Sequence, residues 1–364
     1  MQHLVQYLTS RQQALPSCTA AIGFDGFIDT IVKLVKQKDS NGQPAVYVHS
    51  MAEWGNYILA KKGGNFSIEL QQCSVKPGGN MPNMAMALAK LGVASHCIGA
   101  LGYPGIDPVF SNMPPECRLY SFAPPGTCQA VEFDDGKMML AGMDALNKAD
   151  WNTLKERIPI DVLIHIFNES RLIGLLNWGE LPASTGFWKG LLEEVLPQCR
   201  HQKEKLFLVD LSDCSSRSRE EIIIALKLLP AFAAYGKVIL SLNHNEAIFI
   251  HNQLFEPVSD HNNSMVFAQK LFDRLEIDTL VLHNRHKAVA CRNNALVEKN
   301  SFPVELPKLL TGAGDNFNAG FCFAQLMNCT LEDSLLLAHL NASYYIKNAE
   351  SAGWSQLTAI LKTV

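Results

Sequence analysis

The sequence predicts an α/β protein with a doubly wound, mostly parallel sheet flanked by helices and a small β lid. Three observations support this prediction. Short, β-branched apolar runs alternate with longer amphipathic runs, 364 residues with 48 % hydrophobic content can bury a large core, and two segments in the first half interrupt the alternation. No repeat or linker divides the chain, so we expect a single domain over residues 1–364.

The predicted strands have the sequences AAIGF, DVLIHIF, LFLVDL, KVILSL and TLVLH. The predicted helices between them are MAMALAKLG, FWKGLLEEVL, EEIIIALKLL and MVFAQKLFDRL. Parallel sheets of this kind bind ligands at the carboxyl ends of their strands. The polar residues that follow the apolar runs are therefore the first site candidates: Asp25, Asp29, Asn168, Glu169, Asp210, Asp213, Asn243 to Glu246, and the GAGD that begins at Gly312.

The two segments that break the alternation are expected to form the lid, approximately at residues 31–75 and 117–143. The first is charged and contains glycines. The second contains VEFDDGKMMLAGM, which is typical of a hairpin with its turn at Asp134-Asp135-Gly136. A surface hairpin without a ligand role is an equally open interpretation of the letters.

Composition restricts the function classes. The net charge of −4 comes from 35 acidic and 31 basic side chains mixed along the chain, which argues against a nucleic-acid partner. Ten scattered cysteines without a C-x-x-C pair argue against a zinc ribbon or a disulfide scaffold. The N-terminus is too polar for a signal peptide, and Lys227, Pro230 and Lys237 interrupt the most apolar region, so we expect a cytoplasmic protein without a membrane partner.

The stretch TGAGDNFNAGF has the letters of an anion site. Its glycines allow successive N–H groups to face one concavity at the start of a helix, where partial positive charge favours an anion. Asp315 at that position could accept a proton from a hydroxyl that attacks a phosphoryl group, although an ordinary N-cap aspartate has the same letters. A dinucleotide fingerprint needs glycine where Phe317 stands, and no P-loop motif occurs.

Two further motifs place amides at helix starts. In KPGGNMPNMAMALAKLG a Gly78-Gly79 turn leads into a helix whose first turn carries Asn80 and Asn83. After KVILSL, Asn243 and Glu246 stand three residues apart. Their oxygens suit magnesium held through water near phosphates, and they equally suit a capping box.

In this order the motifs resemble the ribokinase-like (PfkB-type) carbohydrate kinase family, from about Ala20 to Gly353. The resemblance is carried by GFDGFID, GGNMPNMAMALAKLG, the hairpin at FDDGK, NHNE, TGAGDNFNAGF and LAHLNAS. It implies ATP and Mg²⁺ as cofactors, Asp315 as catalytic base, and the N–H groups of Gly312, Ala313 and Gly314 as anion hole. It also assigns Asn243, Glu246 and Asn341 to the nucleotide and magnesium region.

On the substrate side, the resemblance matches Gly79 and Asn83 to the family's substrate loop. It matches Asp29, with Asp25 as the alternative, to the aspartate that binds sugar hydroxyls. Gln129 is expected to face the substrate because of strand alternation on the lid. The resemblance thus implies a small sugar-like alcohol as phosphate acceptor.

The chain departs from the family pattern in two places. Leu309 and Leu310 precede the glycines, and leucine offers no oxygen ligand, which makes the monovalent-cation site of some members doubtful. Asn284 and Lys287 stand where glycines are common, so that a bulkier turn crowds the nucleotide or Lys287 adds a cation near its phosphates.

Three functional hypotheses remain open at this level. The first is an ATP-dependent kinase of a small sugar-like alcohol. The second is a nucleoside kinase, which requires a pocket-facing aromatic such as Trp54, Tyr57 or Phe133. The third is a non-catalytic ligand-binding or regulatory protein. A homodimer through an exposed edge of the lid is a further expectation.

Overall fold

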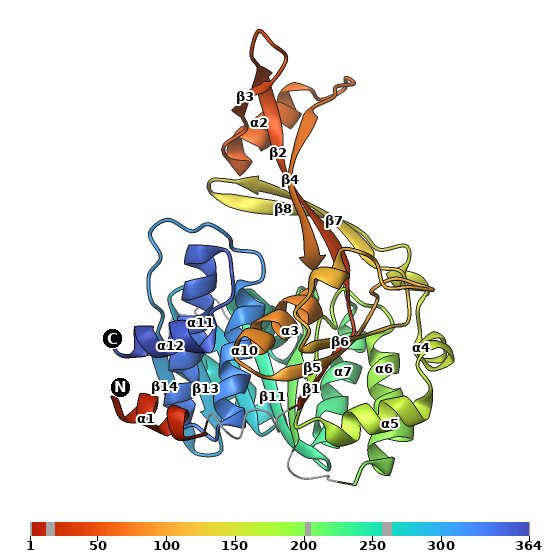
Figure 1. Cartoon of the computed structure of the whole chain (residues 1–364), viewed down its shortest axis with the longest axis vertical. Helices are drawn as coiled ribbons and strands as arrows, with labels where there is room; N and C mark the ends of the chain where they lie inside the picture. The colour runs from red at the N-terminus through yellow and green to blue at the C-terminus, as the bar shows by residue number, and fades with distance from the viewer. Residues whose placement is uncertain (1, 12–18, 201–204, 257–263, 364) are drawn as a thin grey trace.

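The computed structural model describes residues 2–11, 19–200, 205–256 and 264–363. In this part of the chain a nine-stranded sheet lies between two layers of helices, and a five-stranded sheet projects from one end of the body (Figure 1). The α/β class and the separate β lid are as the sequence predicts.

The large sheet has the order β14-β13-β12-β11-β10-β9-β1-β5-β6. Its strands from β6 to β12 are parallel, and β13 and β14 are antiparallel additions at one edge. The strands are β1 Thr19–Gly23, β5 Ala94–Gly99, β6 Cys117–Ser121, β9 Leu172–Leu175, β10 Lys205–Asp210, β11 Gly236–Asn243, β12 Thr279–His283, β13 Lys287–Arg292 and β14 Ala295–Asn300. From β1 the chain adds strands first on one side and then, from β9, on the other. The crevice between the carboxyl ends of β1 and β9 is therefore the expected ligand position.

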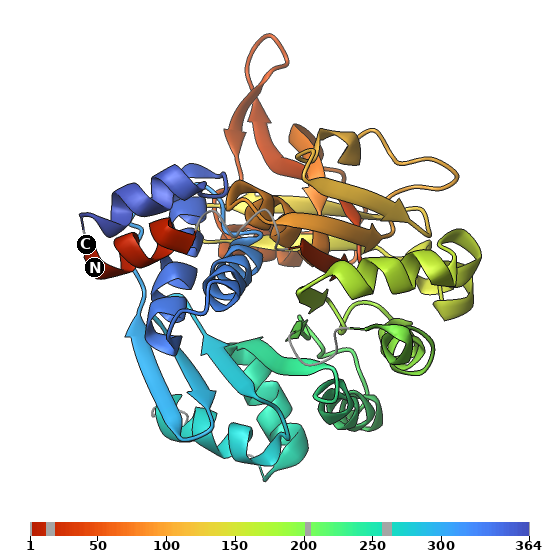
Figure 2. The same cartoon turned by 60° about the horizontal axis from the view of Figure 1, so that its bottom comes forward.

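Helices cover both faces of this sheet, as the view in Figure 2 makes visible. One buried cluster joins the sheet to α4–α9, and the other joins it to α1, α3, α10, α11 and α12. The helices are α1 Gln2–Arg11, α3 Asn80–Lys90, α4 Trp151–Arg157, α5 Ile160–Glu169, α6 Ser184–Gly190, α7 Arg219–Phe232, α8 His244–Leu254, α9 Ser264–Arg274, α10 Ala313–Leu326, α11 Leu331–Asn348 and α12 Trp354–Leu361. Because α3 and α10 lie on the same face, their first turns can meet at the carboxyl ends of the strands.

The predicted strand DVLIHIF is wrong, because these residues belong to α5. The buried side chains Leu163, Ile166 and Phe167 stand three and four residues apart, which is the spacing of one helix face. The strand follows instead as β9, with the sequence LIGL.

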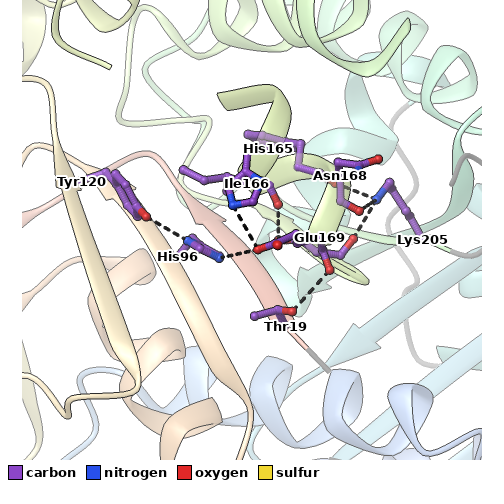
Figure 3. A network of polar contacts seen from close by, with 10 residues as sticks. Thr19, His96, Tyr120, His165, Ile166, Asn168, Glu169 and Lys205 are labelled. Atoms are coloured by element: carbon purple, nitrogen blue, oxygen red, sulfur yellow. Dashed lines mark hydrogen bonds and ion pairs between the residues drawn. The ribbon is translucent and has the colours of Figure 1, made fainter. Parts of the chain in front are cut away.

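The predicted strand-end residues Asn168 and Glu169 therefore lie near the amino ends of β1 and β9, whereas the ligand crevice is at the carboxyl ends. Lys205, the first residue of β10, donates hydrogen bonds to the Phe167 and Ser170 carbonyls at 2.6 and 2.8 Å. Figure 3 shows Glu169 in the same polar network with His96 and His165. The network closes the end of α5 and takes no part in the site described below.

The lid consists of β2 Phe27–Lys38, β3 Pro44–Tyr47, β4 Glu69–Gly78, β7 Gly126–Phe133 and β8 Gly136–Gly142, together with the helix α2 Met51–Ala60. It begins four residues before the predicted boundary at 31 and continues three residues beyond 75. The first predicted segment is thus too short, whereas the second is too long, because residues 117–121 form β6 at the edge of the large sheet. The predicted turn at Asp134-Asp135-Gly136 joins β7 to β8.

Strand register gives the lid two different faces. Asp29 is paired with Cys128 and with Lys76, and Glu132 is paired with Lys137, so these side chains share the face that is turned toward the body. Gln129 has the opposite parity on β7 and is exposed, so the structure does not bring it to the site.

The aromatic residues proposed for nucleoside stacking also lie outside the site. Trp54 and Phe133 pack on the lid's own small core with Val32 and Val131, which have the parity of Gln129, and Tyr57 stacks on Trp54 with ring centroids 5.6 Å apart.

Candidate active site

Asp315 lies in the first turn of α10, only 7 % exposed. Gly312 precedes the helix with φ 92°, a left-handed conformation that favours glycine, and so turns the chain sharply into it. The Asn83 amide, from the first turn of α3, donates a hydrogen bond to Asp315 Oδ2 at 3.1 Å. Burial and the nearby charges of Asp210 and Asp25 raise the pKa of Asp315 well above its ordinary value, while Asn83 and Lys137 oppose the rise. Such a carboxylate is basic enough to take a proton from a hydroxyl.

The three amides that the sequence predicts as an anion hole differ in their hydrogen bonding. The amides of Gly312 and Gly314 have no backbone acceptor in the described chain. The Ala313 amide differs from the prediction, because it donates to the Leu310 carbonyl at 3.2 Å and is therefore already used. Tyr345 holds the loop by donating its hydroxyl to the Thr311 carbonyl at 2.6 Å. An anion would thus meet the Gly312 and Gly314 amides and the positive end of the helix.

Asp25, directly after β1, is completely buried and fully bonded. It accepts the Asn80 and Met81 amides of α3 at 2.7 and 2.8 Å, and the Asn177 side chain at 2.8 Å. Burial raises its pKa to about 6 even though these three donors lower it. The conformation of Gly79 (φ 95°) brings α3 into contact with this carboxylate, since a Cβ there would lie 2.6 Å from Asp25 Oδ2. Asp25 therefore anchors α3 at the switch point between β1 and β9.

Asp29 has a different environment, although it is almost as buried. It stands on β2 of the lid, and no hydrogen bond donor among the described residues contacts its carboxylate. Burial raises its pKa, and Lys76 and Lys137 lower it. Gly78 leaves space for it, because a Cβ at that position would lie 2.1 Å from Asp29 Cγ. Asp29 thus has free acceptor positions on the inner face of the lid, which Asp25 lacks.

Carboxylates also gather after β10 and β11. Asn243 and Glu246 form the capping box of α8, with the Glu246 carboxylate accepting the Asn243 amide at 2.8 Å. Burial and the charge of Asp210 raise the pKa of Glu246 to about 8. Asp210 accepts the Asn318 side chain at 2.7 Å, which links β10 to α10. The capping interpretation is therefore confirmed, and both Glu246 carboxylate oxygens accept hydrogen bonds from Asn243.

Two predicted nucleotide residues have protein partners. The Lys287 ammonium forms an ion pair with Glu298 at 2.9 Å. Asn341 is completely buried and donates to the Asn316 carbonyl at 2.7 Å, so it supports the first turn of α10 from behind. Asn284, the other departure in this region, accepts the His286 and Lys287 amides and thereby forms the tight turn between β12 and β13.

The sequence interpretation missed two groups of residues. Asn177 and Glu180 follow β9, and the incorrect strand at 161–167 concealed them, although the apolar run LIGLL ends directly before Asn177. Lys76 and Lys137 are half-buried on the inner face of the lid, where partial burial lowers the pKa of each. Only strand register could reveal that these lysines share a face with Asp29.

The sequence matches the prokaryotic ketohexokinase family over residues 5–363. This chain belongs to that family. A curated ketohexokinase from Haloferax volcanii is 26 % identical over 342 residues, which span 93 % of this chain and 89 % of the relative.

Solved structures support the fold. Arabidopsis thaliana ribokinase, solved with ribose and ATP, has a TM-score of 0.67 at 16 % identity and covers 95 % of this chain and 98 % of its own. Adenosine kinase from Sinorhizobium meliloti has a TM-score of 0.65 at 16 % identity, with the same coverage. The ribokinase-like fold predicted from the motifs is confirmed.

As a prokaryotic ketohexokinase family member, the protein is a carbohydrate kinase that transfers a phosphoryl group from ATP to a sugar. The expectation of an enzyme is confirmed over the non-catalytic alternative. Among the described helices of this kinase, none has the length and apolar content needed to cross a membrane.

Proposed function

We propose that this kinase phosphorylates a hydroxyl of a ketohexose, with Asp315 as general base. The ketohexose class is suggested by the description of the family and by the Haloferax volcanii relative. The observation that carries the catalytic role is the position of Asp315. It is a buried carboxylate of raised pKa at the positive end of α10, opposite a lid that carries Asp29.

In this mechanism the lid closes one side of the sugar site. Asp29 accepts hydrogen bonds from the sugar hydroxyls, and Asn83 orients the Asp315 carboxylate. Asp315 takes the proton of the reacting sugar hydroxyl, and the oxygen of that hydroxyl forms a bond to the γ-phosphorus of ATP. The bond from that phosphorus to the β–γ bridging oxygen breaks, and the electron pair leaves with ADP. The Gly312 and Gly314 amides stabilise the transferring phosphoryl group.

Magnesium would bind at this site together with the phosphates of ATP. No cluster of three or more His, Cys, Asp or Glu side chains suited to a metal occurs in the described residues. Mg²⁺ usually keeps several waters and is bound by one or two carboxylates together with phosphates. Asp210 and Glu246 are the carboxylates that would hold it, in the case of Glu246 through water, and the ion would neutralise phosphate charge.

Asp315→Asn tests the proposal most directly. The amide keeps the shape of the side chain but cannot take the proton, so we expect turnover to fall by about 10² to 10⁴ with little change in KM. The assay measures ADP release with MgATP and a panel of a ketohexose, an aldohexose, ribose and adenosine. Asp39→Asn, at an exposed turn of the lid, is the control.

Undiminished turnover in Asp315→Asn would exclude Asp315 as base. Preference for adenosine over every sugar would replace the ketohexose assignment with a nucleoside kinase.

A further inference from the structure

Lys137 is the point where the lid reaches the loop of the phosphoryl site. It stands on β8, and its ammonium donates a hydrogen bond to Thr311 Oγ1 at 2.7 Å. Thr311 is only 8 % exposed and directly precedes Gly312. The same residue is fixed from the other side, because its carbonyl accepts the Tyr345 hydroxyl. A lid side chain and a body side chain therefore hold one residue of the loop.

Lys137 bonds to Thr311 although a carboxylate on its own hairpin lies closer in the strand register. Glu132 lies directly opposite Lys137 in the β7–β8 hairpin, which is the arrangement that favours a cross-strand ion pair. No such pair is formed in the described chain, and the ammonium extends toward the body instead. Partial burial of a lysine is unfavourable unless its charge is compensated. Here Asp315 and Asp29 act on the Lys137 ammonium more strongly than Glu132 does. Stability of the hairpin alone does not explain this position.

We propose that Lys137 is a positioning residue for phosphoryl transfer, contributed by the lid, which fixes the Thr311 loop and places a positive charge beside Asp315. The inference rests on the proposed function and extends it. Asp29 and Lys137 lie on the same lid face, so one lid position serves both the sugar and the catalytic loop. The lid position in which Asp29 can bind the sugar is therefore also the one in which Lys137 contacts Thr311.

The charge of Lys137 has a defined effect on the base. Asp315 interacts electrostatically with five charged or titratable groups: Asp25, Asp210, Lys76, Lys137 and Tyr345. Lys137 lowers the pKa of Asp315, in opposition to burial and the two aspartates. Its removal should raise that pKa further. At low pH kcat falls because the base is protonated. This acid limb of the pH profile would then move to higher pH.

The test compares Lys137→Met, Lys137→Arg, Thr311→Val and the double variant Lys137→Met/Thr311→Val. Lys36→Met is the matched control, because Lys36 is an exposed lid lysine that pairs with Glu53. Steady-state kinetics with MgATP and the ketohexose are measured across pH for each variant. Circular dichroism and denaturant unfolding identify any variant that fails to fold. If Lys137→Met fails to fold, Lys137→Arg is compared with the wild type instead.

We expect Lys137→Met to lower kcat/KM at least about tenfold, which corresponds to about 1.4 kcal/mol, and to shift the acid limb upward. Lys137→Arg should keep the wild-type acid limb. The double variant should be no worse than Lys137→Met, because both changes remove the same contact. Lys36→Met should resemble the wild type.

The inference is overturned if Lys137→Met matches Lys36→Met in both kcat/KM and pH profile while the wild type is active. It is also overturned if Lys137→Met and Thr311→Val act additively. A wild type that phosphorylates no sugar would refute the proposed function itself, a result that the variants cannot mimic.

Discussion

At the scale of single residues, Asp25 and Asp29 have different roles although they lie only four residues apart in the chain. Both are buried aspartates after or near β1, and the family resemblance favours Asp29 as the sugar ligand with Asp25 as the alternative. Asp25 has three donors from α3 and Asn177, whereas Asp29 has none among the described residues. A carboxylate whose oxygens are already bonded organises the site, and one with free oxygens can bind a ligand.

Glu246 supports a prediction about stability and pH. Folding raises its pKa from 4.5 to about 8, so the folded state holds the proton more tightly. The stability that this protonation contributes is complete below pH 4.5 and is lost as the pH rises through about 8. Glu246→Gln retains the capping interaction without the charge. Its stability relative to wild type should therefore increase between pH 5 and pH 8.5, as measured by urea unfolding without nucleotide.

A second capping box provides the control. In α7, Glu221 reaches back to the Ser218 amide as Glu246 does to Asn243, but Glu221 is exposed and its hydrogen bond to Ser218 lowers its pKa. Glu221→Gln should accordingly show no gain over wild type in the same pH range. Equal pH dependence of the two variants would contradict the role assigned to burial at Glu246.

At the scale of elements, prediction from sequence succeeded where local chemistry decides the structure. The hairpin turn at Asp134-Asp135-Gly136 and the helix start after Gly312 depend on residues within a few positions. It failed at residues 161–167, where β-branched side chains suggested a strand although Leu163, Ile166 and Phe167 have helical spacing. That error moved the expected strand end from Leu175 back to Phe167, and so Asn168 and Glu169 replaced Asn177 and Glu180 as candidates.

The first turn of α10 allows folding and ligand approach to be separated. A Cβ at Gly314 would meet nothing closer than His283 Cε1 at 3.9 Å, so Gly314→Ala fits the protein. Alanine favours helix over glycine by about 0.5–1 kcal/mol. A phosphoryl group close to the Gly314 amide would nevertheless meet the new methyl group. We expect unchanged or higher stability together with at least about tenfold lower kcat/KM, an effect of about 1.4 kcal/mol.

Gly55→Ala is the corresponding control on the lid. Gly55 lies inside α2, where a Cβ would have no neighbour within 4 Å. This variant should gain similar stability and keep full activity, as judged by denaturant unfolding and the coupled ADP assay. Full activity in Gly314→Ala as well would show that no ligand group approaches the Gly314 amide.

At the scale of the whole molecule, the alternation of apolar runs determined the architecture, and three-dimensional register determined the site. A sheet covered on both faces follows from the pattern of buried strands and amphipathic helices. Which lid residues face the body depends on the pairing of β2 with β4 and β7, including a bulge between Ile31 and Val32. A shift of one residue would exchange Asp29 and Lys76 with the outer face, and no local signal sets that register.

The uneven distribution of buried side chains predicts how the lid behaves. The outer lid has four buried core residues, namely Val32, Leu34, Val48 and Val131, whereas both faces of the large sheet have extensive clusters. Amide hydrogen exchange should therefore be fastest in β3 and α2 and slowest in the central strands β10 and β11. Mass spectrometry of exchanged peptides resolves these segments.

Ligands should change this exchange pattern selectively. If Asp29 binds the sugar and Lys137 fixes the Thr311 loop, a ketohexose with a non-hydrolysable ATP analogue should slow exchange in the β7–β8 hairpin and in residues 308–312. β3 and α2 lie beyond these contacts at the far end of the lid (Figure 1), so their exchange should change little. Equal protection of the whole lid would instead indicate rigid docking of the sheet, and no protection of the hairpin would contradict a lid that acts at the phosphoryl site. The ligand-bound pattern thus tests at the level of the whole protein the contact that Lys137 makes at the level of one residue.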